Sequence, residues 1–483
     1  MRCPLDNTCA EGLCAFYGSG GGAGGGSSDA GRDAGKSDAG GADGGSTRFS
    51  SSPVSWSVPS SGLPDGFGVP KLTGTMRAWD TFDLDGDGKP DLIHTENPAT
   101  GQVWVTASTG AAYWKVYKNT GTGFQTLPIL WTVPASGLPD GFFSTASAVR
   151  FKQWATYDID GDNKPDLVQT ANPLTDGVWA GPLWKVFKNT GSSFSTTALN
   201  WSVPAAPVTL PNGYNAKEAA TNPKPWSTLD LDGDRLPDLV LTSSAGIVFL
   251  QGATAQWHVY KNLGTGFAAT FTAWNVPASG LSDGFTMPNS SVSQRQWATF
   301  DLDGDGRADL VHTANTVSNA VFVLNGAAFW RFYKNLGTGF AATFTSWPVP
   351  PNTLADGFYA SEVTVGTRRW TTRDLNGDGL PDLVHTTNPA NSQVWGDDGG
   401  VYWNVYRNTG TGFSDTPLAW TVPFSGLPEG FFAHASNAAM NRWLSFDLDG
   451  DGKLGLVHTT DPVTDTVWNG ALQPIWKLYR GEP

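Results

Sequence analysis

One acidic turn recurs six times along this chain, and its spacing limits what the chain can fold into. The first copy is "DLDGDGKPDLIHT" at residues 83–95. Further copies begin at Asp158, Asp230, Asp301, Asp374 and Asp447. Successive first aspartates are 75, 72, 71, 73 and 73 residues apart. A period this regular is typical of a repeat architecture, in which each unit buries its apolar face against the next.

Each repeat also contains four strand-like segments separated by turns. In the first repeat these segments are 79–83, 91–95, 114–119 and 130–134, and each is rich in aromatic and β-branched residues. Four antiparallel strands per repeat are typical of a propeller blade. The pattern therefore predicts an all-β protein, a six-bladed β-propeller of four-stranded antiparallel blades.

The two ends of the repeat region are complementary. The region opens with a lone "SWSVP" (55–59), a segment of the fourth type, and closes with "WKLYRG" (476–481), a segment of the third type. An N-terminal strand that completes the last blade would close the ring and leave no open sheet edge. We therefore predict that Trp56 lies beside Trp476 in one sheet.

The chain divides into two parts by composition. Residues 1–54 hold all three cysteines (Cys3, Cys9 and Cys14) and a Gly/Ser/Ala/Asp-rich stretch that cannot bury a core, so we expect a disordered tether there. Residues 55–483 form the repeat body. The net charge of −14 argues against a nucleic-acid partner, and no apolar run is long enough to span a membrane. We infer an extracellular or cell-surface location, although no signal peptide is visible.

The acidic turn has the spacing D-x-D-x-D-G-x-x-D, which places carboxylates at positions 1, 3, 5 and 9. The backbone carbonyl of position 7 can supply a further oxygen. Such an all-oxygen set in a flexible loop favours Ca²⁺, with up to six ions bound. A strand follows each loop and position 12 is not glutamate, so the loop is not an EF-hand.

The predicted metal ligands form six sets, one for each copy of the turn. They are Asp83, Asp85, Asp87, Lys89 and Asp91; Asp158, Asp160, Asp162, Lys164 and Asp166; Asp230, Asp232, Asp234, Leu236 and Asp238; Asp301, Asp303, Asp305, Arg307 and Asp309; Asp374, Asn376, Asp378, Leu380 and Asp382; and Asp447, Asp449, Asp451 and Lys453.

These copies are not equivalent. The last has Gly455 in place of the ninth-position aspartate, so we predict that the site at Asp447 is the weakest. Arg235 stands where other copies have glycine and would strain the turn if its φ is positive. Asn376 keeps an oxygen but loses a charge.

The repeats resemble FG-GAP/VCBS repeats, the blades of integrin α-subunit propellers and of many secreted bacterial proteins. The resemblance is carried by the acidic turn and by "VYKNTGTGF" (116–124), and it covers residues 55–483. It implies a calcium loop between the first two strands of each blade and an extracellular binding or adhesion role. Family members commonly have seven blades, whereas six repeats are present here.

The 22 tryptophans fall into four classes by position, of which three recur in every repeat and are explained by packing between sheets. The fourth class consists of Trp104, Trp179, Trp395 and Trp468. An indole among Asn, Asp and Thr suits a sugar ring, so these four are candidate ligand-binding residues on the face opposite the acidic turns. The alternative is that these four indoles have only a structural role and pack over the tops of the blades.

No catalytic signature is evident. His94, His312, His385 and His458 share one strand position, where sister repeats carry Gln169 and Leu241, so packing explains them. We therefore predict a non-catalytic binding module that recognises glycan. The alternatives are a protein-adhesion module and, with less support, a propeller polysaccharide lyase. The oligomeric state is left open.

Overall fold

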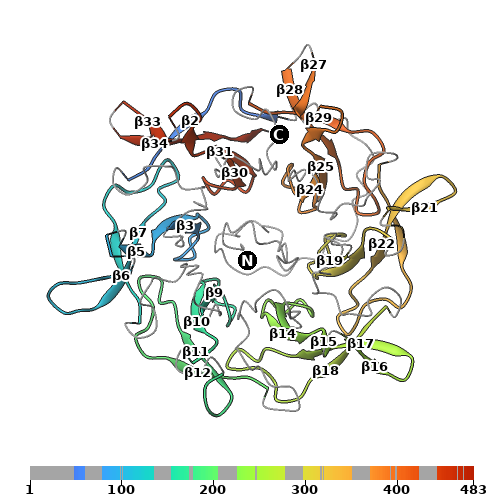
Figure 1. Ribbon diagram of the computed structural model, residues 1–483, viewed down its shortest axis with the longest axis horizontal. Helices are drawn as coiled ribbons and strands as arrows, with labels where there is room; N and C mark the ends of the chain where they lie inside the picture. The colour runs from blue at the N-terminus through green and yellow to red at the C-terminus, as the bar shows by residue number, and fades with distance from the viewer. Residues whose placement is uncertain are drawn as a thin grey trace, which may run out of the picture.

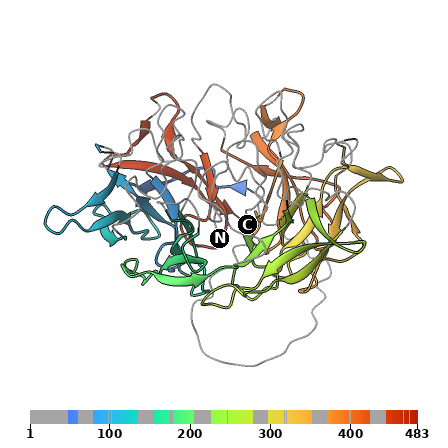
Figure 2. The same cartoon turned by 60° about the horizontal axis from the view of Figure 1, so that its bottom comes forward.

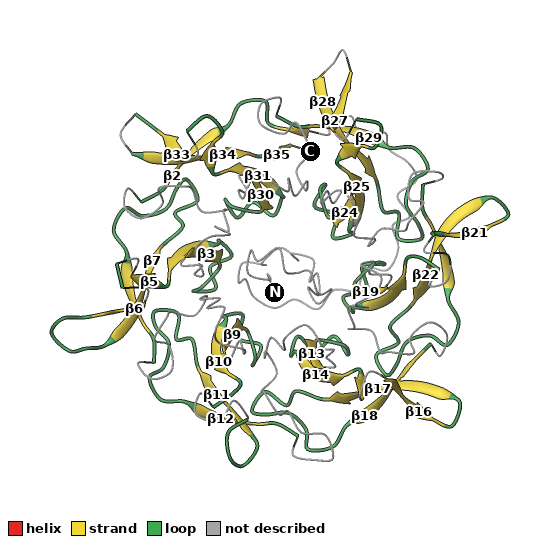
Figure 3. Cartoon of the chain, in the orientation of Figure 1, coloured by secondary structure: helices red, strands yellow, loops and turns green. Residues whose placement is uncertain are grey.

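The computed structural model describes residues 48–482 apart from 60–78, 135–153, 205–225, 278–296, 351–369, 424–442 and several gaps of one to five residues. The three cysteines and residues 1–47 of the predicted tether lie outside these described residues. The described part consists of strands, turns and loops (Figure 3). Within it, no helix has the length and apolarity needed to cross a membrane.

The described strands form six sheets, each carrying one repeat, and we number them as blades 1 to 6 in chain order. Blade 1 contains β3 (Trp79–Phe82), β4 (Asp91–His94), β7 (Ala112–Tyr117) and β8 (Ile129–Thr132), with β6 (Gln102–Val105) and β5 (Glu96–Asn97) added. Blade 2 contains β9 (Trp154–Tyr157), β10 (Asp166–Gln169), β11 (Leu183–Phe187) and β12 (Leu199–Ser202). Blade 3 contains β13 (Trp226–Leu229), β14 (Asp238–Leu241), β17 (Thr254–Tyr260) and β18 (Thr272–Val276), with β16 (Ile247–Gln251) and β15 (Ser243–Ser244).

The remaining three sheets repeat this order. Blade 4 contains β19 (Trp297–Phe300), β20 (Asp309–His312), β22 (Ala327–Tyr333) and β23 (Thr345–Pro348), with β21 (Phe322–Leu324). Blade 5 contains β24 (Trp370–Arg373), β25 (Asp382–His385), β28 (Gly400–Tyr406) and β29 (Leu418–Thr421), with β27 (Gln393–Asp397) and β26 (Thr387–Asn388). Blade 6 contains β30 (Trp443–Phe446), β31 (Gly455–His458), β34 (Pro474–Tyr479) and β2 (Val54–Ser57), with β33 (Thr466–Asn469) and β32 (Thr460–Asp461).

Each blade thus has the four predicted main strands, paired antiparallel, but most blades are larger than predicted. In blade 1, β6 pairs with the first half of β7, through Trp104 and Tyr113, and β5 pairs with β6. The connection between the second and third main strands therefore forms a short hairpin that extends the sheet.

The blades lie around a ring with a propeller arrangement (Figures 1 and 2). Apolar side chains from each pair of neighbouring sheets form one buried cluster, and the last cluster joins blade 6 to blade 1 through residues such as Trp476 and Phe124. The other clusters join successive blades in order. The core is therefore distributed between the sheets, and its largest buried side chains are the tryptophans of the third and fourth strand types.

The N-terminal strand closes the ring, as predicted. β2 pairs antiparallel with β34 (Figure 1). Trp56 lies directly opposite Trp476 in this pairing. The prediction of this pairing is confirmed. It follows from the repeat phase, because the last repeat ends one strand short.

A second N-terminal strand was not predicted. β1 (Arg48–Phe49) pairs parallel with β29 of blade 5 and antiparallel with β35 (Gly481–Glu482). It lies in the range 1–54 that the sequence assigned to the tether, so the described fold begins at Arg48. The exposed ion pair between Arg48 and Glu482, at 2.6 Å, adds little to stability.

Phe49 explains why β1 is held in place. In blades 1 to 5 a phenylalanine of the "GTGF" type packs edge-on against two tryptophans of the preceding blade, as Phe124 does with Trp56 and Trp476. Phe49 makes the same contacts with Trp403 and Trp420, at centroid distances of 5.6 and 5.8 Å. The N-terminal segment therefore supplies both the missing turn phenylalanine and the missing fourth strand of blade 6.

Candidate metal centre

The first aspartate of each acidic turn organises the loop backbone. The Oδ1 atom of Asp83 accepts hydrogen bonds from the amides of Gly86 and Asp87, and its Oδ2 atom accepts one from Gly88. Burial raises the pKa of Asp83, although the amide hydrogen bonds oppose this. The first carboxylate thus fixes the loop backbone through its own hydrogen bonds.

The acidic side chains converge in five of the six loops. In each of these loops three carboxylates offer oxygen atoms that lie within 4.8 Å of one another. The triads are Asp83, Asp85 and Asp87; Asp158, Asp160 and Asp166; Asp230, Asp232 and Asp234; Asp301, Asp303 and Asp309; and Asp447, Asp449 and Asp451. An oxygen-only donor set of this kind fits a hard divalent cation such as Ca²⁺.

Buried oxygens within the loops support this fit. The Oδ1 atoms of Asp85 and Asp160 are buried and have no hydrogen-bond partner among the described residues. A buried, unpaired carboxylate oxygen is costly, and coordination to a cation would satisfy it. The donor atoms present therefore fit the metal. The contribution of the position 7 carbonyls of Lys89 and its equivalents stays a prediction.

The ninth-position aspartate has a second role that sequence reasoning missed. Asp91 is fully buried, and its Oδ1 atom accepts the backbone amide of Asn119 at 2.9 Å. Burial raises the pKa of Asp91 to about 7. The same arrangement links Asp166 to Asn189, Asp238 to Asn262, Asp309 to Asn335 and Asp382 to Asn408. This carboxylate therefore joins the acidic turn to the end of the third strand.

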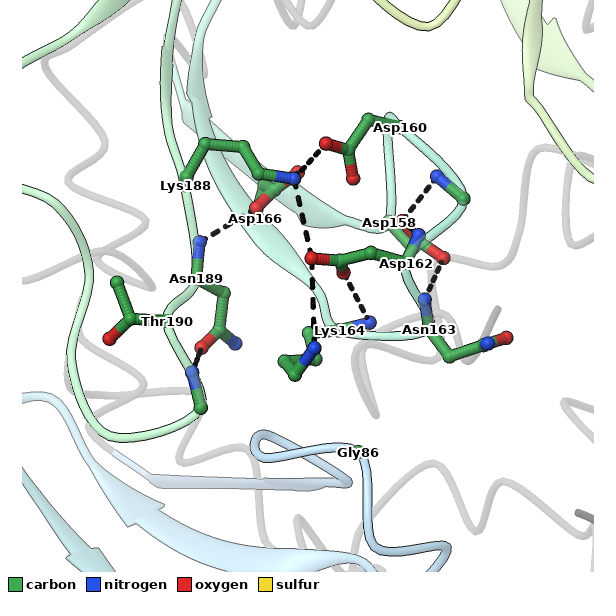
Figure 4. A network of polar contacts seen from close by, with 12 residues as sticks. Gly86, Asp158, Asp160, Asp162, Asn163, Lys164, Asp166, Lys188, Asn189 and Thr190 are labelled. Atoms are coloured by element: carbon green, nitrogen blue, oxygen red, sulfur yellow. Dashed lines mark hydrogen bonds and ion pairs between the residues drawn. The ribbon is translucent and has the colours of Figure 1, made fainter. Parts of the chain in front are cut away.

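The asparagine at that position bridges two blades. The Nδ2 atom of Asn189 donates to the carbonyl of Pro165 in its own blade and to the carbonyl of Leu84 in blade 1, at 3.0 and 2.6 Å. Its Oδ1 atom accepts the amide of Gly191 (Figure 4). Equivalent bridges start from Asn119, Asn262, Asn335 and Asn408. The acidic turns are therefore connected to their neighbours around the ring.

The glycine at position 4 of the turn also allows neighbouring loops to approach each other closely. Gly86 has φ +81°, and a Cβ atom there would lie 3.1 Å from Cγ of Lys164 in the next loop. A Cβ atom on Gly450 would lie 2.8 Å from Cγ of Lys89, so the contact recurs where the ring closes. All six turns have glycine with a positive φ here, and in every blade except blade 5 a Cβ atom would also come within 3.1 Å of a side chain of the next loop.

Two loops depart from the common pattern. In blade 5, Nδ2 of Asn376 donates to Oδ2 of Asp378 at 2.7 Å, and no acidic triad forms among the described residues. In blade 6, Gly455 leaves no ninth carboxylate, and a Cβ atom there would lie 2.8 Å from Cδ1 of Leu478. Gly481 also replaces the bridging asparagine in that blade, so both partners of the Asp–Asn link are absent together. The prediction that site 6 is weakest stays untested.

The expected strain at position 6 is present in blade 3. Arg235 has φ 69°, and Asn163 of blade 2 has φ 63°. Both lie in the left-handed region, which costs a non-glycine residue about 1–2 kcal/mol.

A basic side chain from the third strand enters the acidic turn in most blades. In blade 2, Nζ of Lys188 contacts Asp160 and lies 3.4 Å from Asp162 and 3.5 Å from Asp166 (Figure 4). Lys118, Lys261 and Lys334 make equivalent ion pairs in blades 1, 3 and 4. Arg480 contacts Asp449 in blade 6. The sequence contained this signal, because a Lys or Arg precedes every bridging position, but it was not recognised.

The four candidate ligand-binding tryptophans are half-buried on or near the added hairpins, and their indole N–H groups are buried without a partner in the described part of the chain. Lys115 lies 3.4 Å above the ring of Trp104, Lys185 lies 4.3 Å above Trp179, and Lys477 lies 3.0 Å above Trp468. These ring faces are covered by cations of their own blades. Trp395 differs, because the register position that Lys115 holds in blade 1 is held by Asn404 in blade 5.

The shared histidines pack in the sheets. His94 stacks on Trp79, with ring centroids 3.7 Å apart and 12° between the planes, and it meets Trp104 edge-on. Burial, with a smaller effect of Lys115, lowers the pKa of His94 to about 3. His312 stacks in the same way on Trp297, and its pKa is lowered to about 3 by burial and Arg331.

Comparisons with known proteins add only a general likeness. No family model and no curated protein sequence matches the chain. Among solved structures, a Photorhabdus luminescens Tc holotoxin pore matches at 17% identity over 88% of this chain with a TM-score of 0.45, and this chain spans 14% of that chain. An Agrocybe aegerita lectin, described as recognising non-reducing terminal N-acetylglucosamine, matches at 17% identity over 86% of this chain and 83% of its own, with a TM-score of 0.43.

An α-L-arabinofuranosidase from Clostridium thermocellum is also similar, at 9% identity over 70% of this chain and 92% of its own, with a TM-score of 0.25. All three TM-scores are below 0.5, so these likenesses support no argument about function.

Proposed function

We propose that the chain is a non-catalytic, extracellular or surface-held binding module, a six-bladed propeller whose acidic turns are fastened by Ca²⁺. The observation that carries this proposal is the set of five carboxylate triads, each with its oxygens within 4.8 Å. The triads lie in the same turn of successive blades, and asparagine bridges connect those turns. A cation in each turn would neutralise the carboxylates and hold neighbouring blades together.

The calcium part of this proposal is tested by thermal unfolding. An ion that binds only the folded state stabilises it by mass action, by about 2.7 kcal/mol per site when free ion is a hundred times its dissociation constant. We expect the melting temperature to rise by many degrees when millimolar CaCl₂ replaces EDTA. An equal melting temperature in both buffers would contradict calcium fastening.

Glycan is the proposed ligand, and Trp395 is the best candidate platform for it. Lys115, Lys185 and Lys477 cover the indoles of blades 1, 2 and 6, whereas no cation of the described residues lies over Trp395. Asn404 holds the register position that Lys115 holds in blade 1 and offers an amide there. An accessible apolar ring face with an adjacent amide is the combination that binds sugar rings. Trp395 lies on β27, in a hairpin that projects outward from the ring (Figure 1).

A glycan array probed with the full chain, with and without EDTA, tests this assignment. Trp395→Ala should abolish binding of any sugar that the array identifies, with little change in melting temperature. Trp104→Ala is the matched control, and it should keep binding within about twofold, because Lys115 already occupies that ring. Equal losses in both variants would contradict the special role of Trp395.

A protein-adhesion module is the second candidate. It is favoured by exposed apolar side chains on the outward hairpins of blades 3 and 4, where Leu250, Val323 and Leu324 are 62%, 61% and 59% exposed. Exposed apolar side chains that form a contiguous patch are typical of protein interfaces. An array without any bound sugar, together with a folded protein partner whose binding is lost in Val323→Asp, would favour adhesion. A polysaccharide lyase is the least supported alternative, because the shared histidines are buried against tryptophan.

A further inference from the structure

We propose that the basic residue directly before each bridging asparagine is a tethered cation, which occupies the acidic turn until Ca²⁺ displaces it. The residues concerned are Lys118, Lys188, Lys261 and Lys334 in blades 1 to 4. The inference rests on the proposed calcium binding. It adds that Ca²⁺ competes with a cation of the chain itself.

The contacts of Lys118 show why this ammonium group lies in the metal position. Its Nζ atom contacts Asp85 and lies 3.7 Å from Asp87 and 3.4 Å from Asp91. These three residues are ligands predicted at positions 3, 5 and 9 of one calcium loop. A single cation within reach of all three carboxylates occupies the space that a bound Ca²⁺ would need.

The neighbouring backbone fixes the stem of the lysine. The next residue, Asn119, donates its amide to Asp91 and its side-chain nitrogen to the carbonyls of Pro90 and Leu448. The lysine therefore starts from an anchored point at the edge of the loop. Less side-chain entropy is lost when its ammonium group is placed, because the Cα position is already set.

The degree of burial differs between blades and predicts a graded effect. The side chains of Lys118 and Lys188 are 15% and 23% exposed, whereas those of Lys261 and Lys334 are 48% and 41% exposed. Charge-assisted contacts are stronger where water is excluded. Competition with Ca²⁺ should therefore be stronger in blades 1 and 2 than in blades 3 and 4.

Blade 5 provides an internal comparison. Its turn has Asn376 in place of an aspartate and forms no triad, and its basic residue, Arg407, has no ion pair with the turn in the described part of the chain. The basic side chain thus pairs with the turn where the carboxylates converge and makes no ion pair with it in blade 5, where one charge is missing. This agreement supports attraction by the triad, rather than strand geometry alone, as the cause of the contact.

The test compares two double variants that remove the same charge from the same two blades. Lys118→Met with Lys188→Met removes the tethered cations and keeps an apolar stem. Lys115→Met with Lys185→Met is the matched control, because those ammonium groups lie over Trp104 and Trp179, outside the acidic turns. Isothermal titration with CaCl₂ measures affinity, and thermal unfolding in EDTA measures stability without metal.

We expect the first variant to bind Ca²⁺ about tenfold more tightly than the control at two sites, and to melt at a lower temperature in EDTA. A Lys261→Met, Lys334→Met variant should show a smaller gain, of about threefold. Calcium binding that is equal in the first variant and the control, with equal melting temperatures in EDTA, would overturn the tethered-cation inference alone. Absence of calcium binding in every variant would overturn the proposed calcium function together with this inference.

Discussion

Asn189 illustrates how much of the ring depends on a single side-chain type. Its side chain is buried, and both of its N–H groups and its oxygen are hydrogen-bonded, to Leu84, Pro165 and Gly191. Two of these contacts lie within blade 2, and the third reaches the acidic turn of blade 1. Only an amide of this length supplies two donors and one acceptor here. The residue is therefore a structural link between blades and between metal loops.

Replacing Asn189 by alanine should destabilise the protein by about 2–4 kcal/mol, because buried carbonyl and amide groups then lose their partners. Chemical denaturation in CaCl₂ measures the change. Thr190→Ala is the control, since it removes the exposed hydroxyl that donates to Ser193, and it should cost under about 1 kcal/mol. Similar losses for the two variants would contradict the bridging role.

The buried histidines predict an acid-sensitive stability. The pKa values of His94 and His312 are lowered to about 3 in the folded chain, from 6.5. The unfolded chain binds more protons between these values, so stability is complete above pH 6.5 and is lost as the pH falls through that window. Each histidine should reduce stability by ~2 kcal/mol between pH 7.5 and 5.

A double variant, His94→Gln with His312→Gln, isolates this effect, because blade 2 already carries Gln169 at the same position. The free energy of unfolding should be measured in saturating CaCl₂, so that the aspartates stay ionised. We expect the variant to lose less stability than the parent on acidification, whatever its stability at pH 7.5. Parallel pH profiles would contradict the buried, neutral state of these histidines.

Among the secondary-structure elements, β1 has an importance out of proportion to its two residues. Phe49 is 1% exposed and packs between Trp403 and Trp420. It stands seven residues before Trp56, the same spacing that separates Phe124 from Trp131 in the first repeat. The N-terminal segment is therefore the displaced end of the sixth repeat.

Phe49→Ala should destabilise the protein by about 3–5 kcal/mol, the usual cost of removing a buried phenylalanine. The free energy of unfolding by guanidinium chloride measures this. Leu127→Ala serves as the control, because Leu127 is 78% exposed and its removal should cost under about 0.5 kcal/mol. A loss below about 1 kcal/mol for Phe49→Ala would show that β1 does not hold the ring closed.

The molecule as a whole is held together by the pairing of its two ends. β2 completes blade 6, and β1 joins blade 5 to β35, so both neighbouring sheets depend on residues 48–57. Without that segment, Trp476 and Phe124 would lose a buried neighbour and β34 would present an open edge. We therefore expect the ring to be stable only as a closed unit.

A chain that begins at Thr47 should therefore melt within a few degrees of the full chain, whereas one that begins at Val58 should melt far lower or aggregate. A synthetic peptide of residues 47–59, added in trans, should restore part of the lost stability. Differential scanning calorimetry of the three chains measures this. Unchanged melting of the chain that begins at Val58 would contradict closure by the N-terminal segment.

The sequence alone determined the strand-rich repeat, the acidic turns and the pairing of Trp56 with Trp476, because each follows from a short pattern repeated at a constant period. Short sequence spacing is enough to predict such a turn, since its backbone amides donate hydrogen bonds to the turn's own first aspartate. The packing of the shared histidines was also predictable, from their replacement by Gln169 and Leu241 in sister repeats.

Only the tertiary structure decided which groups meet across the blades. The bridge from Asn189 to Leu84 joins residues 105 apart in the chain, and that from Asn119 to Leu448 joins residues 329 apart. The lysines inside the acidic turns, the cations over three of the four tryptophans and the seating of Phe49 depend in the same way on neighbouring strands or sheets. The bridge from Asn119 to Leu448 depends further on ring closure, because a flat series of repeats has no fixed neighbours at its ends, whereas a ring brings its last blade against its first.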